Sequence, residues 1–172
     1  MTLPKASVTG SPFSLKLERP EDGPTVEALI DRAFGPGRHA KAAERLREGR
    51  LPLLDLSHVA WQGGAIAGCC RMWRIKVGET PALLLGPFAV ESEWRSLGLG
   101  AALIEAACGA AEVEGHGLIF LVGDAPYFAP MGFEIAPAGR LIMPGPADPR
   151  RIMIRTLKPG AGDGLSGPVR PA

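Results

Sequence analysis

Two glycines, Gly98 and Gly100, stand at the start of an alanine-rich stretch in the segment RSLGLGAALIEAACGAAEVEG. Glycine costs a helix about 1 kcal/mol relative to alanine, so a pair of glycines at a helix start indicates a close approach to the backbone. The first N–H groups of a helix have no intrahelical partner and carry a partial positive charge. With Arg95 just ahead of the loop, the segment predicts a site where backbone amides hold a diphosphate.

Three alternative roles for these glycines make different demands on the sequence. Close packing of the helix on a sheet also favours glycine, and the local pattern alone leaves this alternative open. A nucleotide-hydrolase phosphate loop requires Gly-Lys followed by Ser or Thr, and the sequence contains no such triplet. A dinucleotide site requires a third glycine where this chain has Leu103, and too few residues follow Asp124 to complete that sheet. Both nucleotide folds are therefore disfavoured.

The glycine segment must be positioned by elements that alternate between strand and helix patterns. Apolar periodicity and turn residues predict a strand over 13–20, helices over 21–35 and 38–50, a hairpin over 56–77, a strand over 80–90, a helix over 98–114, and strands over 118–122 and 150–157. Gly86-Pro87 predicts a bulge, because proline cannot donate to a strand ladder. The strand–helix–strand order around Gly98 predicts a parallel pair with a right-handed crossover. The fold class expected is mixed α/β.

The central helix is predicted to pack one side on the sheet. Spacings of three and four residues assign its buried stripe to Leu99, Ala102, Leu103, Ala106, Ala110 and Val113. Glu105, Glu112 and Gly109 fall on the opposite side. This arrangement presents the helix N-terminus at the carboxyl end of the preceding strand.

Composition limits the classes of protein. With 172 residues the chain fits one domain, and 19 basic against 18 acidic residues argue against a nucleic-acid partner. The sequence has no apolar run long enough for a membrane helix and no apolar signal region at its start, so we expect no membrane partner. Three cysteines and three scattered histidines lack metal spacing, which predicts no metal site and a reduced, cytoplasmic protein.

The stretch from residue 83 to 133 resembles the GCN5-related N-acetyltransferase (GNAT) superfamily. The family's acyl-CoA loop, Gln/Arg-x-x-Gly-x-Gly/Ala, falls on Arg95 to Gly100, and LVGDAPYFAPMGF is similar to a subgroup with Leu-Val-Gly-Asp before a short helix and Gly-Phe. The resemblance covers about residues 13–158. It implies a mixed, mainly antiparallel sheet with a central parallel strand pair splayed around acyl-CoA and helices on both faces. Residues 1–12 would form an N-terminal extension and 159–172 a flexible tail, because the tail contains few apolar residues.

The same resemblance assigns parts of an acetyl-CoA site. Backbone groups of Phe88, Ala89 and Val90 would pair with pantetheine as an added strand would. Amides of the loop and first helical turn would hold the pyrophosphate: Arg95, Ser96, Leu97, Gly98, Leu99, Gly100 and Ala101. Phe128, at the position where the family usually has a tyrosine, would also contact the cofactor.

The implied chemistry is direct attack of an amine on the thioester carbonyl. A lysine-like amine has a pKa of about 10.4, so supplying its neutral form at pH 7 costs about 4–5 kcal/mol. Candidate bases are Glu91 and Asp124, although a cap on the helix at Ala125-Pro126 also explains Asp124. Phe128 has no proton to give the leaving thiolate. Either the adjacent Tyr127, turned by about 100° on a helix, donates from another angle, or solvent does.

The function expected is acetyl-CoA-dependent transfer of an acetyl group to a primary amine of a small molecule or peptide. The alternatives are a catalytically weak acyl-CoA-binding or regulatory module and a glycine loop that serves packing only. We expect a solvated face formed by Arg38, Lys41, Arg45 and Arg47. If these residues bind the acceptor instead, the acceptor carries an acidic group. A homodimer through the last strands is left open.

Overall fold

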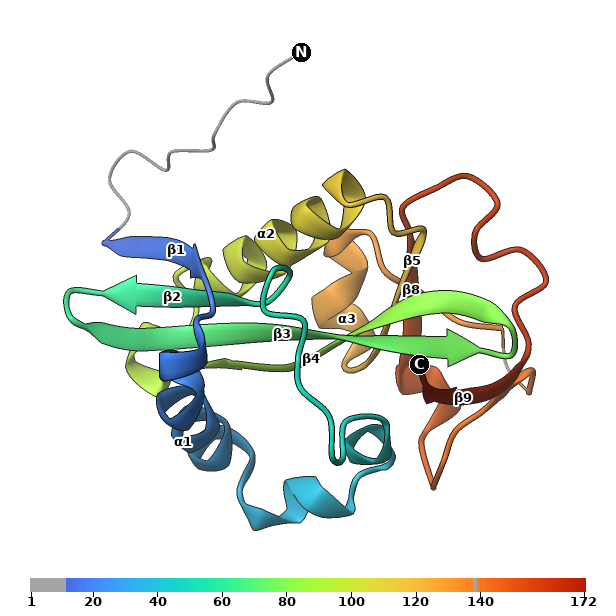
Figure 1. Cartoon of the computed structure of the whole chain (residues 1–172), viewed down its shortest axis with the longest axis horizontal. Coiled ribbons are helices and arrows are strands. Elements are labelled where there is room, and N and C mark those ends of the chain that lie inside the picture. The colour runs from blue at the N-terminus through green and yellow to red at the C-terminus, as the bar shows by residue number, and fades with distance from the viewer. Residues whose placement is uncertain (1–11, 138) are drawn as a thin grey trace.

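A twisted sheet with helices on both of its faces organises the chain (Figure 1). The structure is a computed structural model that describes residues 12–137 and 139–172. The extension expected over 1–12 lies almost wholly outside the described residues. The helices are α1 (Gly23–Phe34), α2 (Leu99–Val113) and α3 (Ala125–Phe128). The strands are β1 (Phe13–Leu17), β2 (His58–Gln62), β3 (Ala65–Val77), β4 (Thr80–Val90), β5 (Leu118–Val122), β6 (Glu134–Ile135), β7 (Leu141–Ile142), β8 (Ile152–Thr156) and β9 (Gly167–Pro171).

The strand order confirms the predicted sheet. Along the main path it is β1-β2-β3-β4-β5-β8-β6, and β9 pairs with β3 and β7. Every pairing on that main path is antiparallel except the one between β4 and β5, which is parallel. The β2–β3 hairpin turns at Gly63-Gly64, where Gly63 has φ 59°. The chain therefore crosses from β4 to β5 through α2, as the strand–helix–strand pattern predicts.

The two long helices cover opposite faces, with α2 above the sheet and α1 below it in Figure 1. Neighbouring residues of β3 alternate between them: Cys70 packs in the cluster with α2, and Cys69 in the cluster with α1. Burial raises the pKa of both thiols, that of Cys69 to about 12. Both cysteines therefore remain protonated core residues.

The buried stripe of α2 differs from the predicted one. The structure buries Leu99, Leu103, Ile104, Ala107, Cys108 and Ala111, whereas the side chain of Val113 is 74% exposed and Ala102, Ala106 and Ala110 are half-buried. The helix is apolar on most of its circumference, so periodicity alone does not fix which side faces the sheet. The larger Ile104 and Cys108 pack inward, and this rotates the stripe.

The second predicted helix, over 38–50, is also wrong. The structure has two 3-10 turns, Pro36–Ala40 and Ala42–Leu46, separated by Lys41 in an extended conformation with φ −74° and ψ 145°. Ion pairs from Arg38 to Asp31 and Glu27 of α1 hold the first turn in place. The interruption changes where the basic side chains of this segment lie.

The expected disorder of 159–172 is contradicted by β9. This strand is antiparallel to β3, with Ile75 opposite Pro171 and Val77 opposite Val169. Leu165 and Val169 are buried in the cluster that contains Trp73 and Ile75. Two buried apolar side chains and a free length of β3 offset the ordering entropy, which composition alone does not reveal.

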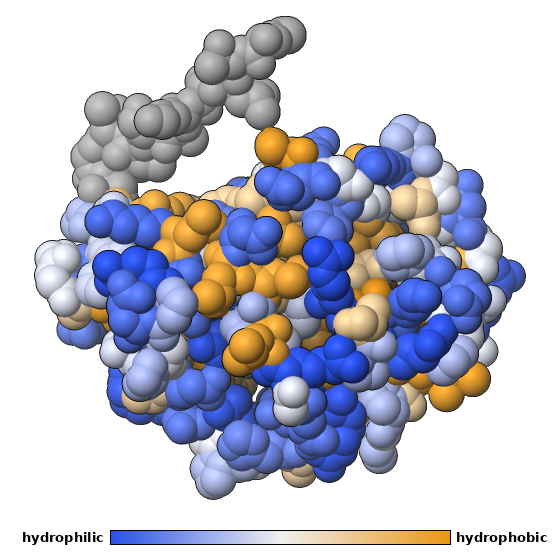
Figure 2. Space-filling view, viewed as in Figure 1, coloured by the Kyte–Doolittle hydropathy of each residue, from blue (hydrophilic) through white to orange (hydrophobic). Residues whose placement is uncertain are grey.

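Figure 2 shows hydrophilic side chains around the periphery of one face and apolar ones gathered over its middle. The large exposed apolar residues are spread over separate elements, from Leu15 and Leu17 on β1 to Ile142 on β7.

Among the described residues, 12–137 and 139–172, no helix has both the length and the apolarity needed to cross a membrane.

Candidate active site

The bulge predicted at Gly86-Pro87 is present in β4. Cys70 pairs with Phe88 and Met72 with Leu85, so two residues of β4 stand opposite one residue of β3. Gly86 has φ 129°, and its carbonyl accepts a hydrogen bond from the Trp73 indole N–H. A bulge breaks the ladder and redirects the strand, here toward its exit at Val90.

Strands β4 and β5 separate just before this bulge. Their parallel pairing is confined to Leu83 with Ile119 and Leu84 with Phe120. Beyond these pairs a cavity of about 610 Å³ opens, lined on one side by β4 from Leu84 to Phe88 and on the other by 121–124. The V-shaped splay expected from the sequence is therefore confirmed.

The loop between β4 and α2 has the backbone of an anion site. Ser96 has φ 64° and Gly98 has φ 80°, both in the left-handed region. Left-handed residues among right-handed ones turn successive N–H groups to one side, and a non-glycine residue held this way is a marker of function. The first α2 amide bonded to a helical carbonyl is that of Ala102, which donates to Gly98 at 3.1 Å. The amides just before it lie at the positive end of the helix.

The two glycines of the loop have different surroundings. No atom lies within 4 Å of a side chain built on Gly98, so this residue is needed for its positive φ. A Cβ on Gly100 would lie 2.8 Å from Cζ of Phe88 and would overlap the Tyr127 hydroxyl. Gly100 therefore admits two aromatic side chains, which is the close packing that the sequence left open as an alternative.

A second cavity of about 470 Å³ covers this loop. It is lined by Ala33, Phe34, Phe88, Ala89, Val90, Trp94, Arg95, Ser96, Gly98, Gly100, Ala101 and Tyr127. Most of the predicted acyl-CoA residues are thus brought together on one surface; Leu97 and Leu99 do not line it, and Leu97 is exposed. The guanidinium of Arg95 turns back, and its Nε donates to the Val90 carbonyl at 3.2 Å. Arg95 therefore braces the end of β4.

Phe88 and Tyr127 line both cavities and stand between them. Their ring centroids are 6.1 Å apart. Phe128 lies deeper, against Gly123, Phe133 and Tyr127, and is buried. Tyr127 is 44% exposed, and its partial burial raises the pKa of its hydroxyl, which therefore carries its proton near neutral pH. The neighbouring position, Phe128, has an apolar packing role and also lines the larger cavity.

The two candidate bases have different positions. Asp124 lines the larger cavity at the end of β5 and precedes α3. Its carbonyl accepts from the amides of Tyr127 and Phe128, but its side chain makes no capping hydrogen bond. Glu91 lies just beyond β4, pairs with Arg32 of α1 and lines neither of these cavities. The structure thus brings Asp124, and not Glu91, to the cavity wall.

Basic residues expected to be solvated line the larger cavity instead. Arg38, Lys41 and Arg47 reach it, whereas Arg45 is exposed and pairs with Glu48. Arg151, in the 3-10 turn Pro149–Arg151 before β8, also lines the cavity and was missed, since nothing in its local pattern distinguishes it. The extended Lys41 is the reason that Arg38 and Arg47 turn inward, because one helix would have aligned them differently.

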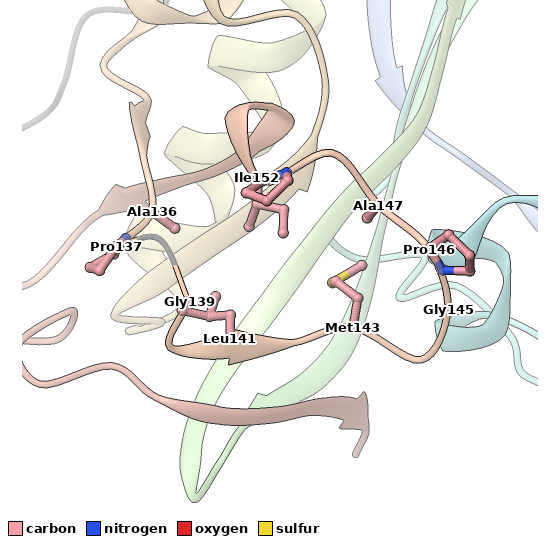
Figure 3. Close-up of a pocket in the computed structure, with 10 residues that line it drawn as sticks. Ala136, Pro137, Gly139, Leu141, Met143, Gly145, Pro146, Ala147 and Ile152 are labelled. Carbon is pink, nitrogen blue, oxygen red and sulfur yellow. The ribbon is translucent and has the colours of Figure 1, made fainter.

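Figure 3 shows a further, smaller cavity of about 290 Å³, enclosed by the segment 136–149 and Ile152. Leu141, Met143 and Ile152 point into it, and its described lining contains no titratable or nucleophilic side chain. It shares Pro146 and Ala147 with the cavity between β4 and β5. This smaller cavity is apolar space beside the site.

The splayed parallel pair, the glycine loop and the two adjoining cavities fall largely within one range of the chain. A family model described as an acetyltransferase (GNAT) domain matches residues 55–135. These residues are similar to the GNAT acetyltransferase family. The resemblance to GNAT acyltransferases recognised in the sequence is confirmed.

Similar GNAT proteins extend over nearly the whole chain. The uncharacterized N-acetyltransferase YhbS of Escherichia coli is 26% identical over 157 residues, 90% of this chain and 93% of YhbS. A crystal structure of E. coli YhbS in complex with CoA matches with a TM-score of 0.79, covering 93% of this chain and 89% of that one. A GNAT acetyltransferase from Brucella melitensis, in complex with acetyl-CoA, shares the fold with a TM-score of 0.68 at 21% identity, covering 93% and 96%.

Proposed function

We propose that this protein transfers an acetyl group from acetyl-CoA to a primary amine of a small molecule or peptide. The observation that carries the proposal is the left-handed backbone at Ser96 and Gly98, immediately before α2, in the wall of a cavity that adjoins a second one. One cavity suits a diphosphate and its pantetheine arm, and the other suits an acceptor. The YhbS structure, which is named as a complex with CoA, supports the same assignment.

The donor would be held by backbone groups. The candidates for the pyrophosphate are the amides from Ser96 to Ala101, because the helix start offers unpaired N–H groups and a partial positive charge. The Arg95 amide is used within the protein, since it donates to the Ser92 carbonyl at 3.4 Å. Past the bulge, the β4 backbone at Phe88, Ala89 and Val90 lines the same cavity and lies where β5 no longer pairs with it. An extended ligand can bond there as a strand would.

In the reaction, acetyl-CoA supplies an activated thioester carbonyl. The amine nitrogen forms a bond to that carbon, the carbon–sulfur bond breaks, and the amine loses one proton while the thiolate gains one. We assign the acceptor's proton to Asp124, directly or through water, because this carboxylate lines the acceptor cavity and has no ion-pair partner among the described residues. Glu91 is the second candidate and is held by Arg32.

Tyr127 is the proposed proton donor to the thiolate. It stands between the two cavities and its pKa is raised by burial, so it retains its proton at neutral pH. A thiol with a pKa of about 8.5 also accepts a proton from water, so loss of the tyrosine would slow the reaction without ending it. A positioned acid contributes about 10²- to 10⁴-fold. We expect Tyr127→Phe to lower kcat by at most about 10⁴-fold, and by less where water protonates the thiolate efficiently.

The first test is binding. Acetyl-CoA at 100 times its Kd should stabilise the fold by about 2.7 kcal/mol, and CoA should act similarly, whereas NAD should have no effect. The second test is release of CoA thiol with a panel of amines, in the protein and in Tyr127→Phe. Binding without turnover of any amine would identify an acyl-CoA-binding module instead. Absence of stabilisation at millimolar acetyl-CoA would refute the donor site.

A further inference from the structure

We propose that the acceptor amine carries an anionic group, a carboxylate or a phosphate, held by Arg47 and Arg151 with support from Lys41. This inference rests on the proposed function, since it places the acceptor in the larger cavity. The cavity wall contains four cations, Arg38, Lys41, Arg47 and Arg151, and two carboxylates, Asp124 and Asp148.

Ion pairs within the protein neutralise part of this set. Arg38 donates to Asp31 and to Glu27 of α1, each at 2.8 Å, so both forks of its guanidinium are used. Asp148 is paired with Arg150 at 2.9 Å. Lys41, Arg151 and Asp124 have no ion-pair partner among the described residues, and Arg47 has Glu44 alone. These three cations and the carboxylate of Asp124 remain to face a ligand. The cavity is therefore cationic, although the whole chain has a formal net charge of only +1.

Arg47 is the most enclosed of the three. Its side chain is 12% exposed, and Nη2 donates to Glu44 at 2.9 Å. Burial lowers the pKa of Arg47, opposed by the hydrogen bond and charge of Glu44. Its Nη1 points to the bulge, 3.8 Å from the position of a Cβ on Gly86. A guanidinium with one edge satisfied and the other at the bulge suits an anionic partner beside the reacting carbonyl.

Arg151 and Lys41 approach the same space from other walls. Arg151 Nε donates to the Gly123 carbonyl at 3.3 Å, which fixes the guanidinium plane and leaves its terminal nitrogens for a ligand. Lys41 Nζ lies 5.2 Å from the ring centroid of Phe34. Among the described residues, neither Lys41 nor Arg151 has a carboxylate partner within ion-pair distance. Arg47, Arg151 and Lys41 thus line the same cavity.

The remaining carboxylate defines the polarity of the acceptor. Asp124 follows β5 on the wall that carries Gly123, the residue whose carbonyl holds Arg151. An acceptor that places its amine near Asp124 and its anion near Arg47 and Arg151 matches the unpaired carboxylate and an unpaired cation of the wall, beside an arginine that has a single carboxylate partner. The substrate class is thus a zwitterion with an amine and an anionic group a few bonds apart. A neutral amine would leave Lys41 and Arg151 without an anionic partner and Arg47 with Glu44 alone.

The test compares three primary amines of matched length: 3-aminopropylphosphonate, 4-aminobutyrate and n-butylamine. With CoA present, we expect the two anionic probes to raise the unfolding midpoint and n-butylamine to leave it unchanged. In turnover with acetyl-CoA, kcat/KM should be about 10- to 100-fold higher for the anionic probes, as charge-assisted hydrogen bonds predict. Comparing phosphonate with carboxylate identifies which anion the site prefers.

Variants connect this preference to the named residues. Arg47→Gln and the exposed Arg151→Gln should each reduce the ratio of anionic to neutral kcat/KM by about tenfold or more, mainly through KM. Arg45→Gln is the matched control, because Arg45 belongs to the same segment, pairs with Glu48 and does not line the cavity. Should Arg47→Gln fail to fold, Arg151→Gln carries the test.

The outcomes separate the two proposals. If acetyl-CoA and CoA do not stabilise the protein, the proposed function fails. If they do, but anionic probes stabilise no more than n-butylamine and show equal kcat/KM, the anionic acceptor is refuted. An unchanged ratio in both folded variants would likewise overturn the roles of Arg47 and Arg151.

Discussion

Gly100→Ala tests whether aromatic packing or ligand access accounts for the second glycine of the loop. The new methyl group would meet Phe88 Cζ at 2.8 Å and overlap the Tyr127 hydroxyl, so at least one ring must move. Overpacking of this kind costs about 1–3 kcal/mol, whereas alanine for glycine in a helix gains about 1 kcal/mol. The net expectation is a loss of about 0–2 kcal/mol in the free energy of unfolding.

Repeating Gly100→Ala in a variant that lacks the two aromatic rings separates the overlap with those rings from other effects of the substitution. In a protein carrying Tyr127→Ala and Phe88→Leu, the atoms that oppose the methyl group are gone, and Gly100→Ala should stabilise by about 1 kcal/mol. The difference between the two backgrounds, about 1–3 kcal/mol, is the coupling energy and is measured by urea unfolding of the four proteins. Gly98→Ala is the control. It should cost about 1–2 kcal/mol in both backgrounds, because its φ of 80° is strained whatever the neighbours.

Equal effects of Gly100→Ala in the two backgrounds would refute the packing explanation. CoA titration of the same four proteins then addresses the ligand. If the α2 amides hold the diphosphate, Gly100→Ala weakens CoA binding even where the clash is absent. Binding that recovers fully in the Tyr127→Ala, Phe88→Leu background would show that Gly100 serves the rings alone.

Two further predictions concern stability. Leu165→Ala should lower the free energy of unfolding by about 2–5 kcal/mol, because Leu165 is buried beside β3. Leu51→Ala, at an exposed residue, is the control and should change the free energy of unfolding little. Equal urea midpoints for the two variants would show that the segment before β9 contributes nothing. Burial lowers the pKa of His58, so the unfolded chain binds a proton more readily and stability should fall as pH decreases below about 6.5. His58→Gln should reduce this dependence of unfolding free energy on pH, whereas His39→Gln, at an exposed residue, should leave it unchanged. An unchanged pH dependence in His58→Gln would assign the effect to other groups.

Features set by neighbouring residues could be predicted from the sequence. The hairpin at Gly63-Gly64, the bulge at Gly86-Pro87 and the start of α2 after Gly98 follow from backbone preferences of glycine and proline. The parallel crossover follows from the strand–helix–strand order. The loop that carries the candidate donor site is therefore predictable from its own residues and their immediate neighbours.

Features set by distant partners could not. The rotation of α2 depends on which side of an almost wholly apolar helix meets β3. The order of β9 depends on the unpaired end of β3, where Val77 receives Val169. The local sequence pattern identifies neither partner. Apolar periodicity therefore predicted the wrong buried face of α2, and composition wrongly predicted a flexible tail over 159–172.

The candidate acceptor cavity depends most on the segment that sequence reasoning described least well. A continuous helix over 38–50 would place Arg38, Lys41 and Arg45 on one solvated side. The extended Lys41 splits it, so that Arg38 is anchored to α1 and Arg47 reaches the bulge of β4. The same break leaves Arg45 in solvent. The proposed acceptor selectivity rests on Arg47, whose position depends on this backbone irregularity. Substitutions that restore helix at Lys41 should therefore alter selectivity before they alter CoA binding.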